Sequence, residues 1–282
     1  MQPAGPVRSD QESVAGQGAL PQEPECPPSW STGPPDFVGI GAQRCGTTWW
    51  FGGALQTHPL VAIPPGRRKE FHFFDRYWTE DVEPDFAARY ARFFPRPEGS
   101  ITGEWTPGYM CDPWAVPLLA EAAPEARYLI MLRDPVERYR SGIAPALRRS
   151  HERGYDPLDI VIANHAVLHS MYYGQVKRAL EILGRDRVLV LQYERCVDDP
   201  LAQMQRTQRF LGLEPLESIP RALERRVPSG LLFPLGDNPP LPARLRLELT
   251  SALADDVRQV AAVCPDLDLG LWPSFASVQM GS

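Results

Sequence analysis

The sequence lacks the patterns that mark several large classes of protein. No apolar run approaches the roughly 18 residues of a membrane span, and the N-terminus has neither the basic nor the apolar region of a signal peptide. We therefore expect a cytosolic protein without a membrane span. The formal net charge of -6 argues against general nucleic-acid binding, although it permits a locally basic cleft.

Cysteine and histidine patterns of metal and redox sites are also missing. The five cysteines are odd in number and widely scattered, with no C-x-x-C pair, so we expect reduced thiols. The five histidines show no H-E-x-x-H or similar spacing. We therefore predict that the protein needs no metal.

What is present is the composition of an ordinary globular domain behind a polar tail. Residues 1–34 are rich in Pro, Gly, Ser and Gln and have few bulky apolar side chains, so they cannot offset their ordering entropy. We predict a disordered tail over residues 1–34 and one folded domain over residues 35–282.

Strand and helix patterns alternate along this domain. Buried strands are predicted at 36–41, 60–63, 100–105, 126–132 and 187–193. Helices are predicted at about 47–56, 83–94, 113–122, after 134, at 157–183 behind an Asp156 cap, at 198–213 and at 243–263, with an irregular stretch over 215–242. This order predicts an α/β fold with a parallel sheet in three layers. Ligands of such sheets bind at the carboxyl ends of the strands, which here precede the loops after Ile40, Leu132 and Tyr193.

The first of these loops reads "GAQRCGTTWW", from Gly41 to Trp50. Gly41 and Gly46 have the spacing of a phosphate-binding loop, but Thr47 stands where that motif places its lysine. Arg44 offers a guanidinium fork instead. The pattern favours a ligand with one charged group at its 5′ end, bound without metal. A structural glycine turn with a surface arginine is the alternative.

The stretch "RCGTTW" resembles the 5′-phosphosulfate-binding loop of sulfotransferases that use 3′-phosphoadenosine-5′-phosphosulfate (PAPS), whose usual form is K-x-G-T-T. The resemblance implies a P-loop-like sulfotransferase fold, closest to bacterial and glycan-type enzymes, with PAPS as co-substrate. Arg44 falls on the lysine position and would act electrostatically, because an arginine is poor at delivering a proton. By the same resemblance Trp49 would stack on or edge the adenine, and the loop residues that bind the cofactor are Arg44, Cys45, Gly46, Thr47 and Thr48.

A second segment, "LRDPVERYRSG", follows the strongest strand pattern and resembles the 3′-phosphate motif of the same family. That motif places an arginine at a strand end and a serine eight residues later, which gives Arg133 and Ser141 here. Arg138 and Arg140 have no such match and are expected at the surface. Taken alone, "RDP" is only a helix-start signal.

The stretch "RRKEFHFFD" resembles the "KExHFFD" segment of glycan-type sulfotransferases, which implies that Glu70 is the catalytic base and that His72 lies beside the acceptor. The two residues alternate on a short segment, so an extended backbone would put both side chains on one face. An aromatic core strand flanked by solvated charges is the alternative. His58, His165 and His169 have no comparable sequence context and are expected to be structural.

Two further segments extend the resemblance. "GEWTPGYM" resembles "GEKTPxY" with Trp105 in place of the lysine, which favours a neutral sugar face, an aromatic ring or a lipid-like acceptor, or else a core tryptophan. "VLVLQYERCVDDP" resembles "YEDLxxDP", which places Tyr193 near the adenine. The family's basic segment that closes over the 3′-phosphate has no clean counterpart, and "ERRVPSG" is the nearest basic stretch.

The leading hypothesis is a PAPS-dependent sulfotransferase that transfers a sulfuryl group to a hydroxyl of a carbohydrate, lipid or secondary metabolite. The first alternative is a nucleotide or small-molecule kinase on a P-loop scaffold, against which stands the missing loop lysine. The second is a nucleotide-binding interaction protein without catalysis, against which stands Glu70.

Overall fold

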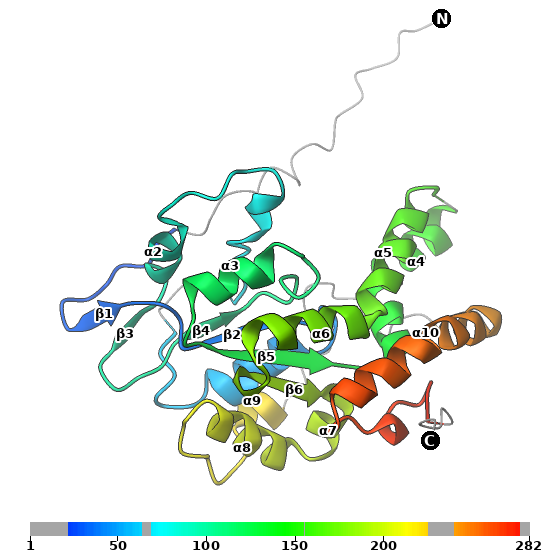
Figure 1. The fold of residues 1–282 in the computed structure, drawn as a ribbon. Helices are drawn as coiled ribbons and strands as arrows, with labels where there is room; N and C mark the ends of the chain where they lie inside the picture. Colours follow the sequence, from blue (N-terminus) through cyan, green and yellow to red (C-terminus); the bar gives the residue numbers. More distant parts are fainter. Residues whose placement is uncertain (1–21, 64–68, 155, 225–239, 277–282) are drawn as a thin grey trace, which may run out of the picture.

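A computed structural model describes residues 22–63, 69–154, 156–224 and 240–276. Its centre is a parallel sheet with the strand order β4 (Gly103–Trp105), β2 (Phe37–Gly41), β5 (Arg127–Leu132) and β6 (Val188–Gln192). Helices cover both faces of the sheet (Figure 1). The predicted three-layer α/β fold is confirmed.

The central strands are buried on both faces, which explains their continuous apolar sequences. All five residues of β2 and five of the six residues of β5 are buried. Glycine at position 39 is required by a close approach, because a Cβ there would lie 2.0 Å from the ring of Trp105 on the neighbouring strand.

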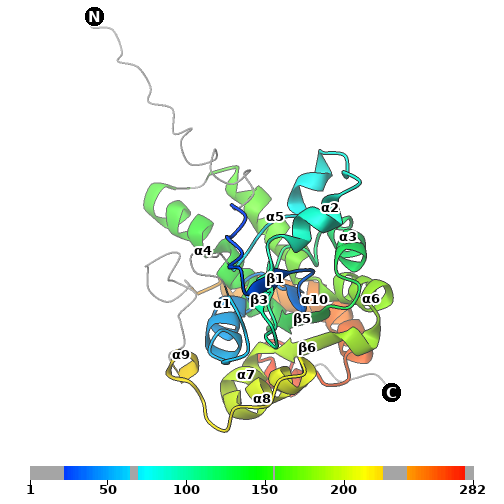
Figure 2. The ribbon, with the colours of Figure 1, turned by 90° about the vertical axis from the view of Figure 1, so that its left-hand side faces the viewer.

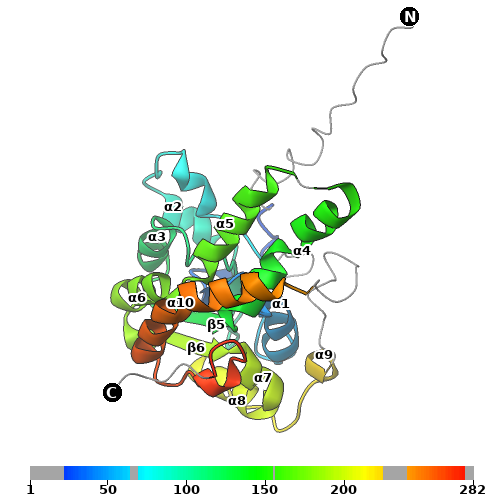
Figure 3. The same cartoon turned by 90° about the vertical axis from the view of Figure 1, so that its right-hand side faces the viewer.

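Two groups of helices form the outer layers (Figures 1 and 2). One face is covered by α3 (Ala115–Ala122), α6 (Tyr172–Leu183) and α10 (Ala243–Val263). On the other face α1 (Thr47–Trp50) continues as the π-helix η2 (Phe51–Leu55), against which α8 (Pro200–Phe210) and α9 (Arg221–Glu224) pack. The remaining helix pair, α4 (Pro135–Arg153) and α5 (Asp159–Ser170), extends beyond the carboxyl ends of the strands (Figure 3).

Shorter elements complete the chain. Helix α2 (Phe86–Ala91) lies within the predicted range 83–94, and a short helix α7 (Tyr193–Asp198) follows β6. The 3-10 turns η3, η4 and η5 span Asp75–Trp78, Arg185–Arg187 and Leu269–Leu271.

Besides the short helices α7 and α9, which the sequence did not predict, the structure differs from the sequence prediction in three places. The expected strand at 60–63 forms only a bridge between Val61 and Ile101. The helix expected over 157–183 breaks at Met171, because the Asp256 carboxylate accepts hydrogen bonds from the backbone N–H groups of Tyr172 and Tyr173 and so starts a new helix.

The third difference concerns the predicted disordered tail. Within it, strand β1 (Trp30–Thr32) pairs antiparallel with β3 (Pro95–Pro97), so regular structure begins before residue 35. The pairing supplies backbone partners that the polar composition of this stretch does not reveal. Residues 1–21 of the tail lie outside the described residues.

Candidate active site

The phosphate-binding loop predicted from the sequence lies between β2 and α1. Gly46 has φ 88°, and a Cβ at this position would lie 2.6 Å from the ring of Tyr193, so glycine is required on both counts. Arg44, half-buried, also has a left-handed backbone (φ 67°). Thr47 is buried and Thr48 exposed at the start of the helix. The predicted strand, loop and helix are therefore all present.

The loops that follow β5 and β6 meet this first loop at Tyr193. The Arg133 guanidinium lies 4.9 Å from the centre of the Tyr193 ring, and the Trp49 ring packs edge-on against it at 6.0 Å. Ser141 is buried on α4. The structure thus brings Gly46, Trp49 and Arg133 around one tyrosine, as expected for strand ends of one parallel sheet.

Two of the residues predicted to bind the cofactor have side chains with little or no exposed surface. Trp49 is only 5% exposed, and its indole N–H donates to the Leu223 carbonyl over 2.9 Å, so no more than an edge faces solvent. Cys45 is fully buried with its Sγ 3.5 Å from the Tyr172 hydroxyl, and burial raises the pKa of its thiol to about 11. The Cys45 side chain is a neutral packing group.

Arg138, expected at the surface, is instead 3% exposed. Its Nε donates to the Gln43 carbonyl over 3.1 Å and its Nη1 to the Ala166 carbonyl over 2.8 Å. The guanidinium therefore connects the phosphate-binding loop to α5. Arg138 lies on the side of α4 that faces the interior of the protein. A sequence match to the 3′-phosphate motif does not reveal this role.

The C-terminal segment secures the Arg133 loop through two carboxylates that the sequence prediction missed. Asp134 caps α4 by accepting from the N–H groups of Val136 and Glu137, and it also accepts from the N–H of Ser274. Glu194 accepts from the N–H of Asp134 and from the indole of Trp272, and burial raises its pKa to about 7.

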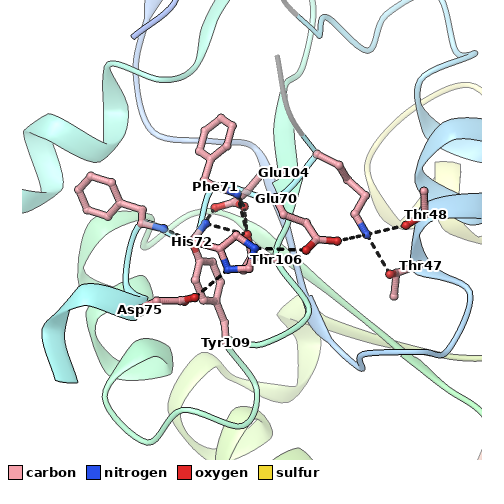
Figure 4. Close-up of polar contacts among 11 residues, drawn as sticks. Thr47, Thr48, Glu70, Phe71, His72, Asp75, Glu104, Thr106 and Tyr109 are labelled. Atoms are coloured by element: carbon pink, nitrogen blue, oxygen red, sulfur yellow. Dashed lines mark hydrogen bonds and ion pairs between the residues drawn. The ribbon is translucent and has the colours of Figure 1, made fainter. Parts of the chain in front are cut away.

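Glu70, His72 and Asp75 form one chain of polar contacts (Figure 4). His72 Nε2 lies 3.3 Å from Glu70 Oε2, and His72 Nδ1 lies 2.7 Å from Asp75 Oδ2. The two predicted side chains meet, but not on an extended segment: His72 has φ 54°, so the backbone turns there. The sequence prediction did not assign Asp75, although it ends the quoted "KEFHFFD".

Ion pairing shifts both titrating groups of this chain. The hydrogen bonds that the imidazolium donates to Asp75 and Glu70 raise the pKa of His72 to about 10. Burial raises the pKa of Glu70, but the contacts with His72 and Lys69 outweigh it and bring the value to about 2. At neutral pH, His72 is an imidazolium and Glu70 a carboxylate.

A buried network holds the backbone of this turn. Thr106 Oγ1 accepts from the N–H of Phe71 over 2.9 Å, and Tyr109 Oη accepts from the N–H of Phe73 over 2.9 Å. The Glu104 carboxylate, fully buried, accepts from both of those hydroxyls and from the N–H of Phe71. Figure 4 shows these groups behind Glu70 and His72.

Trp105 belongs to the core, which decides between the two interpretations of the sequence. It is 0% exposed, packs on Gly39, and its Nε1 donates to the Gly41 carbonyl over 3.1 Å. Of the two alternatives, the core tryptophan is therefore the one that the structure supports: Trp105 packs against β2 and its indole binds the start of the phosphate-binding loop.

Lys69 joins the Glu70 cluster to the phosphate-binding loop and was not assigned from the sequence. Its Nζ donates to Thr47 Oγ1 over 3.0 Å and to Thr48 Oγ1 over 3.1 Å, and it lies 2.7 Å from Glu70 Oε1. Its position directly before the predicted base is the feature of the sequence by which it could have been assigned.

Other histidines make structural contacts, as expected. His58 Nε2 lies 2.9 Å from the Glu214 carbonyl, and His169 contacts His165 and Cys111. In the part of the chain that the structure describes, no three His, Cys, Asp or Glu side chains are arranged to hold a metal ion. Among the same residues, no helix has the length and apolar character to cross a membrane. The basic stretch "ERRVPSG" lies almost wholly outside the described residues.

Comparison with known proteins finds similar sequences and a similar fold. The structure of a sulfotransferase from Alicyclobacillus acidocaldarius superposes with a TM-score of 0.64 at 27% sequence identity, covering 84% of this chain and 98% of that one. Heparan sulfate glucosamine 3-O-sulfotransferase 6 of Homo sapiens is 30% identical over 171 residues, which are 57% of this chain and 47% of the relative.

A shorter match, 33% identical over 104 residues, is to the membrane-associated sulfotransferase kil1 of Dictyostelium discoideum and covers 37% of this chain and 21% of the relative. The chain thus spans less than half the length of these two curated relatives. A family model described as "Sulfotransferase family" matches residues 88–218. Together with the fold and the bacterial structure, these matches support a sulfotransferase family for this chain.

Proposed function

We propose that this protein transfers a sulfuryl group from PAPS to a hydroxyl of a carbohydrate, lipid or secondary metabolite. The observation that carries the proposal is the meeting of Gly46, Trp49 and Arg133 around Tyr193. Lys69 links that meeting point to the Glu70 carboxylate through the two loop threonines. A donor bound at both of its ends and a base for the acceptor are the two requirements of sulfuryl transfer.

The residues present fit PAPS as co-substrate. The side chains of Arg133 and Ser141 provide a cation and a hydroxyl for the 3′-phosphate. Those of Arg44, Thr47 and Thr48, with the backbone N–H groups of the loop, suit the phosphosulfate. Gly46 allows the Tyr193 ring to lie close against the loop, and the rings of Tyr193 and Trp49 suit an adenine. When bound, PAPS supplies the sulfuryl group.

Glu70 is the better candidate for the general base. It is ionised at neutral pH, whereas His72 already carries its proton and cannot accept another. The imidazolium lies between Glu70 and Asp75 and orients the carboxylate that faces the acceptor. Arg44 and the start of α1 would neutralise charge near the leaving phosphate.

For the acceptor, we propose a neutral hydroxyl compound, with glycans first. The human relative is named for transfer to a glucosamine of heparan sulfate, which supports a glycan acceptor. The acidic groups around the base favour a neutral glycan over a polyanionic one: Asp112 interacts with Asp75 and His72, and burial raises the Asp112 pKa to about 6. We also propose the cytosol as the location.

Thermal shift tests the donor site against the kinase alternative. Adenosine 3′,5′-bisphosphate, without metal, should raise the melting temperature, and the rise should grow with the logarithm of its concentration above the Kd. ATP with Mg²⁺ should raise it much less, since a nucleoside triphosphate has no 3′-phosphate for Arg133. A larger stabilisation by ATP with Mg²⁺ would favour a kinase and contradict the proposal.

A further inference from the structure

Lysine is rare in this chain, and one of its lysines is nearly buried. The sequence has two lysines, Lys69 and Lys177, among 29 basic residues. Lys177 is half-exposed on α6, 3.9 Å from Glu181. The Lys69 side chain is only 13% exposed. Removing an ammonium from water costs several kcal/mol unless nearby groups compensate for it.

The compensating groups of Lys69 are the two threonines of the phosphate-binding loop and the predicted base. An ammonium has three N–H donors, and oxygens of Thr47, Thr48 and Glu70 lie within 3.1 Å of Nζ. The Lys69 backbone is fixed as well, because its carbonyl accepts from the N–H of Trp105 on β4 over 2.9 Å. Lys69 therefore reaches the loop from a neighbouring rigid segment.

The hydroxyls of Thr47 and Thr48 can also donate hydrogen bonds to a bound anion. A threonine that accepts a hydrogen bond from an ammonium still has its own O–H to donate. Lys69, Thr47 and Thr48 together therefore present one cation and two hydroxyl donors to an anion in the loop. Arg44, a further cation beside this group, has Arg138, Glu70 and Arg148 as electrostatic neighbours, and burial is the main cause that lowers its pKa.

We propose that Lys69 is a second cation, beside Arg44, that neutralises the 5′-phosphate as the sulfuryl group leaves it, and that it stands in for the lysine that the loop lacks at Thr47. This inference rests on the proposed function. Transfer forms a bond from the acceptor oxygen to sulfur and breaks the bond from sulfur to the 5′-phosphate oxygen, which keeps the electron pair. The acceptor proton passes to Glu70, and the Lys69 ammonium stabilises the new negative charge through a hydrogen bond without losing its proton.

The contact between Lys69 and Glu70 couples the two ends of this reaction. An ammonium drawn toward a bound phosphate interacts less with the Glu70 carboxylate, and loss of that ion pair raises the proton affinity of the base. Binding of the donor thereby makes Glu70 a stronger base.

Kinetics of three variants test the assignment. Lys69→Ala should lower kcat about 10²–10³-fold, the usual cost of one lost donor to a developing oxyanion, with KM for PAPS changed only a few-fold. Lys69→Arg should recover part of kcat because it restores the charge. Lys177→Ala is the matched control and should keep wild-type kinetics. A kcat within three-fold of wild type for Lys69→Ala would overturn the inference.

Side-chain NMR gives a readout that does not depend on turnover or on any variant of Lys69 folding. Protein labelled with ¹³C-lysine should give two ε-methylene signals, which Lys177→Ala assigns. Adenosine 3′,5′-bisphosphate should shift the Lys69 signal and leave that of Lys177, whereas adenosine 3′-monophosphate, which lacks the 5′-phosphate, should not shift Lys69.

The outcomes separate the two hypotheses. If adenosine 3′,5′-bisphosphate binds by calorimetry but leaves the Lys69 signal in place, the role of Lys69 is refuted and the proposed function stands. If the wild-type protein neither binds this nucleotide nor forms sulfated product, the proposed function fails and the Lys69 assignment fails with it.

Discussion

Glu70 and His72 lie in one chain of contacts but differ in charge state at neutral pH, which makes their roles separable. Glu70→Gln keeps the shape of the side chain but removes the proton acceptor. We expect kcat to fall about 10²–10⁴-fold while affinity for adenosine 3′,5′-bisphosphate stays within a few-fold. Steady-state kinetics with a good acceptor and calorimetry on the same variant measure the two quantities.

His72→Ala is the companion variant. Because His72 is already protonated, its loss should lower kcat less than the loss of the Glu70 carboxylate. A larger loss of kcat in His72→Ala, with cofactor binding retained, would make His72 the base and reduce Glu70 to an orienting group.

Arg133 tests the 3′-phosphate site. Arg133→Ala removes a charge-assisted contact worth about 1.5–3 kcal/mol, so the Kd for adenosine 3′,5′-bisphosphate should rise about 10–150-fold by calorimetry. Arg149→Ala, which removes the ion pair between Arg149 on the outer part of α4 and Asp159 at the start of α5, is the control and should leave this Kd unchanged. Equal affinity of Arg133→Ala and wild type would refute the assignment.

The loop between β2 and α1 tests whether shape, rather than backbone strain alone, matters at Gly46. Gly46→Ala places a methyl group in a left-handed backbone and against the Tyr193 ring. Gly99→Ala has nearly the same φ (76°) but meets no atom within 4 Å. The left-handed backbone should cost each variant about 1–2 kcal/mol of stability. Gly46→Ala should lose more because of its contact with the Tyr193 ring, and it alone should weaken binding of adenosine 3′,5′-bisphosphate. Similar nucleotide affinity of the two variants would contradict the contact with Tyr193.

The turn around Glu70 depends on the buried carboxylate of Glu104. Glu104→Ala leaves several buried donors without this acceptor, among them the hydroxyls of Tyr90 and Tyr109. Each stranded group costs about 1–3 kcal/mol, so denaturant unfolding should show a loss of at least about 3 kcal/mol. Glu104→Gln keeps one acceptor oxygen and should lose less. A loss below about 1 kcal/mol in the alanine variant would mean that the network does not hold the turn.

At the scale of elements, the sequence predicts a strand or helix well where its residues are continuously buried. It predicts poorly where a residue distant in sequence determines where an element begins or ends. The buried strand sequences predicted β2, β5 and β6, and amphipathic spacing predicted α10 over 243–263. The break at Met171 depends on Asp256, which is remote in sequence. The pairing of β1 with β3 could not be predicted because neither strand has an apolar sequence pattern.

The same distinction applies to the candidate site. Motifs indicated the phosphate-binding loop, Arg133 and Glu70, because each lies in a short stretch whose residue types suit an anion or a proton. Lys69 and Arg138 were missed since their contacts, with Thr47 and Gln43, join segments that spacing alone does not bring together. The roles of all these residues remain predictions for experiment.

For the molecule as a whole, the charged chain of Glu70, His72 and Asp75 should make stability depend on pH. The pKa of His72 is raised from 6.5 to about 10, so its contribution is complete below about 6.5 and is lost as pH rises through about 10. The pKa of Glu70 is lowered from 4.5 to about 2, so its contribution is present above about 4.5 and is lost as pH falls toward 2.

The difference in Tm between wild type and His72→Asn should therefore be largest between about pH 4.5 and 6.5 and should shrink toward pH 10. Thermal melts across this range measure it. A difference that stays constant from pH 5 to 10 would show that His72 is not held as an imidazolium by its two carboxylates.

Transfer of the sulfuryl group itself tests the central claim most directly. Wild-type protein and Glu70→Gln would be incubated with ³⁵S-labelled PAPS, EDTA and a panel of neutral glycans and other hydroxyl compounds. We predict a labelled sulfate ester with at least one acceptor, formed by wild type in the presence of EDTA and about 10²–10⁴-fold more slowly by Glu70→Gln. No labelled product from wild type with any acceptor, together with transfer of phosphate from ATP in the presence of Mg²⁺, would contradict the account.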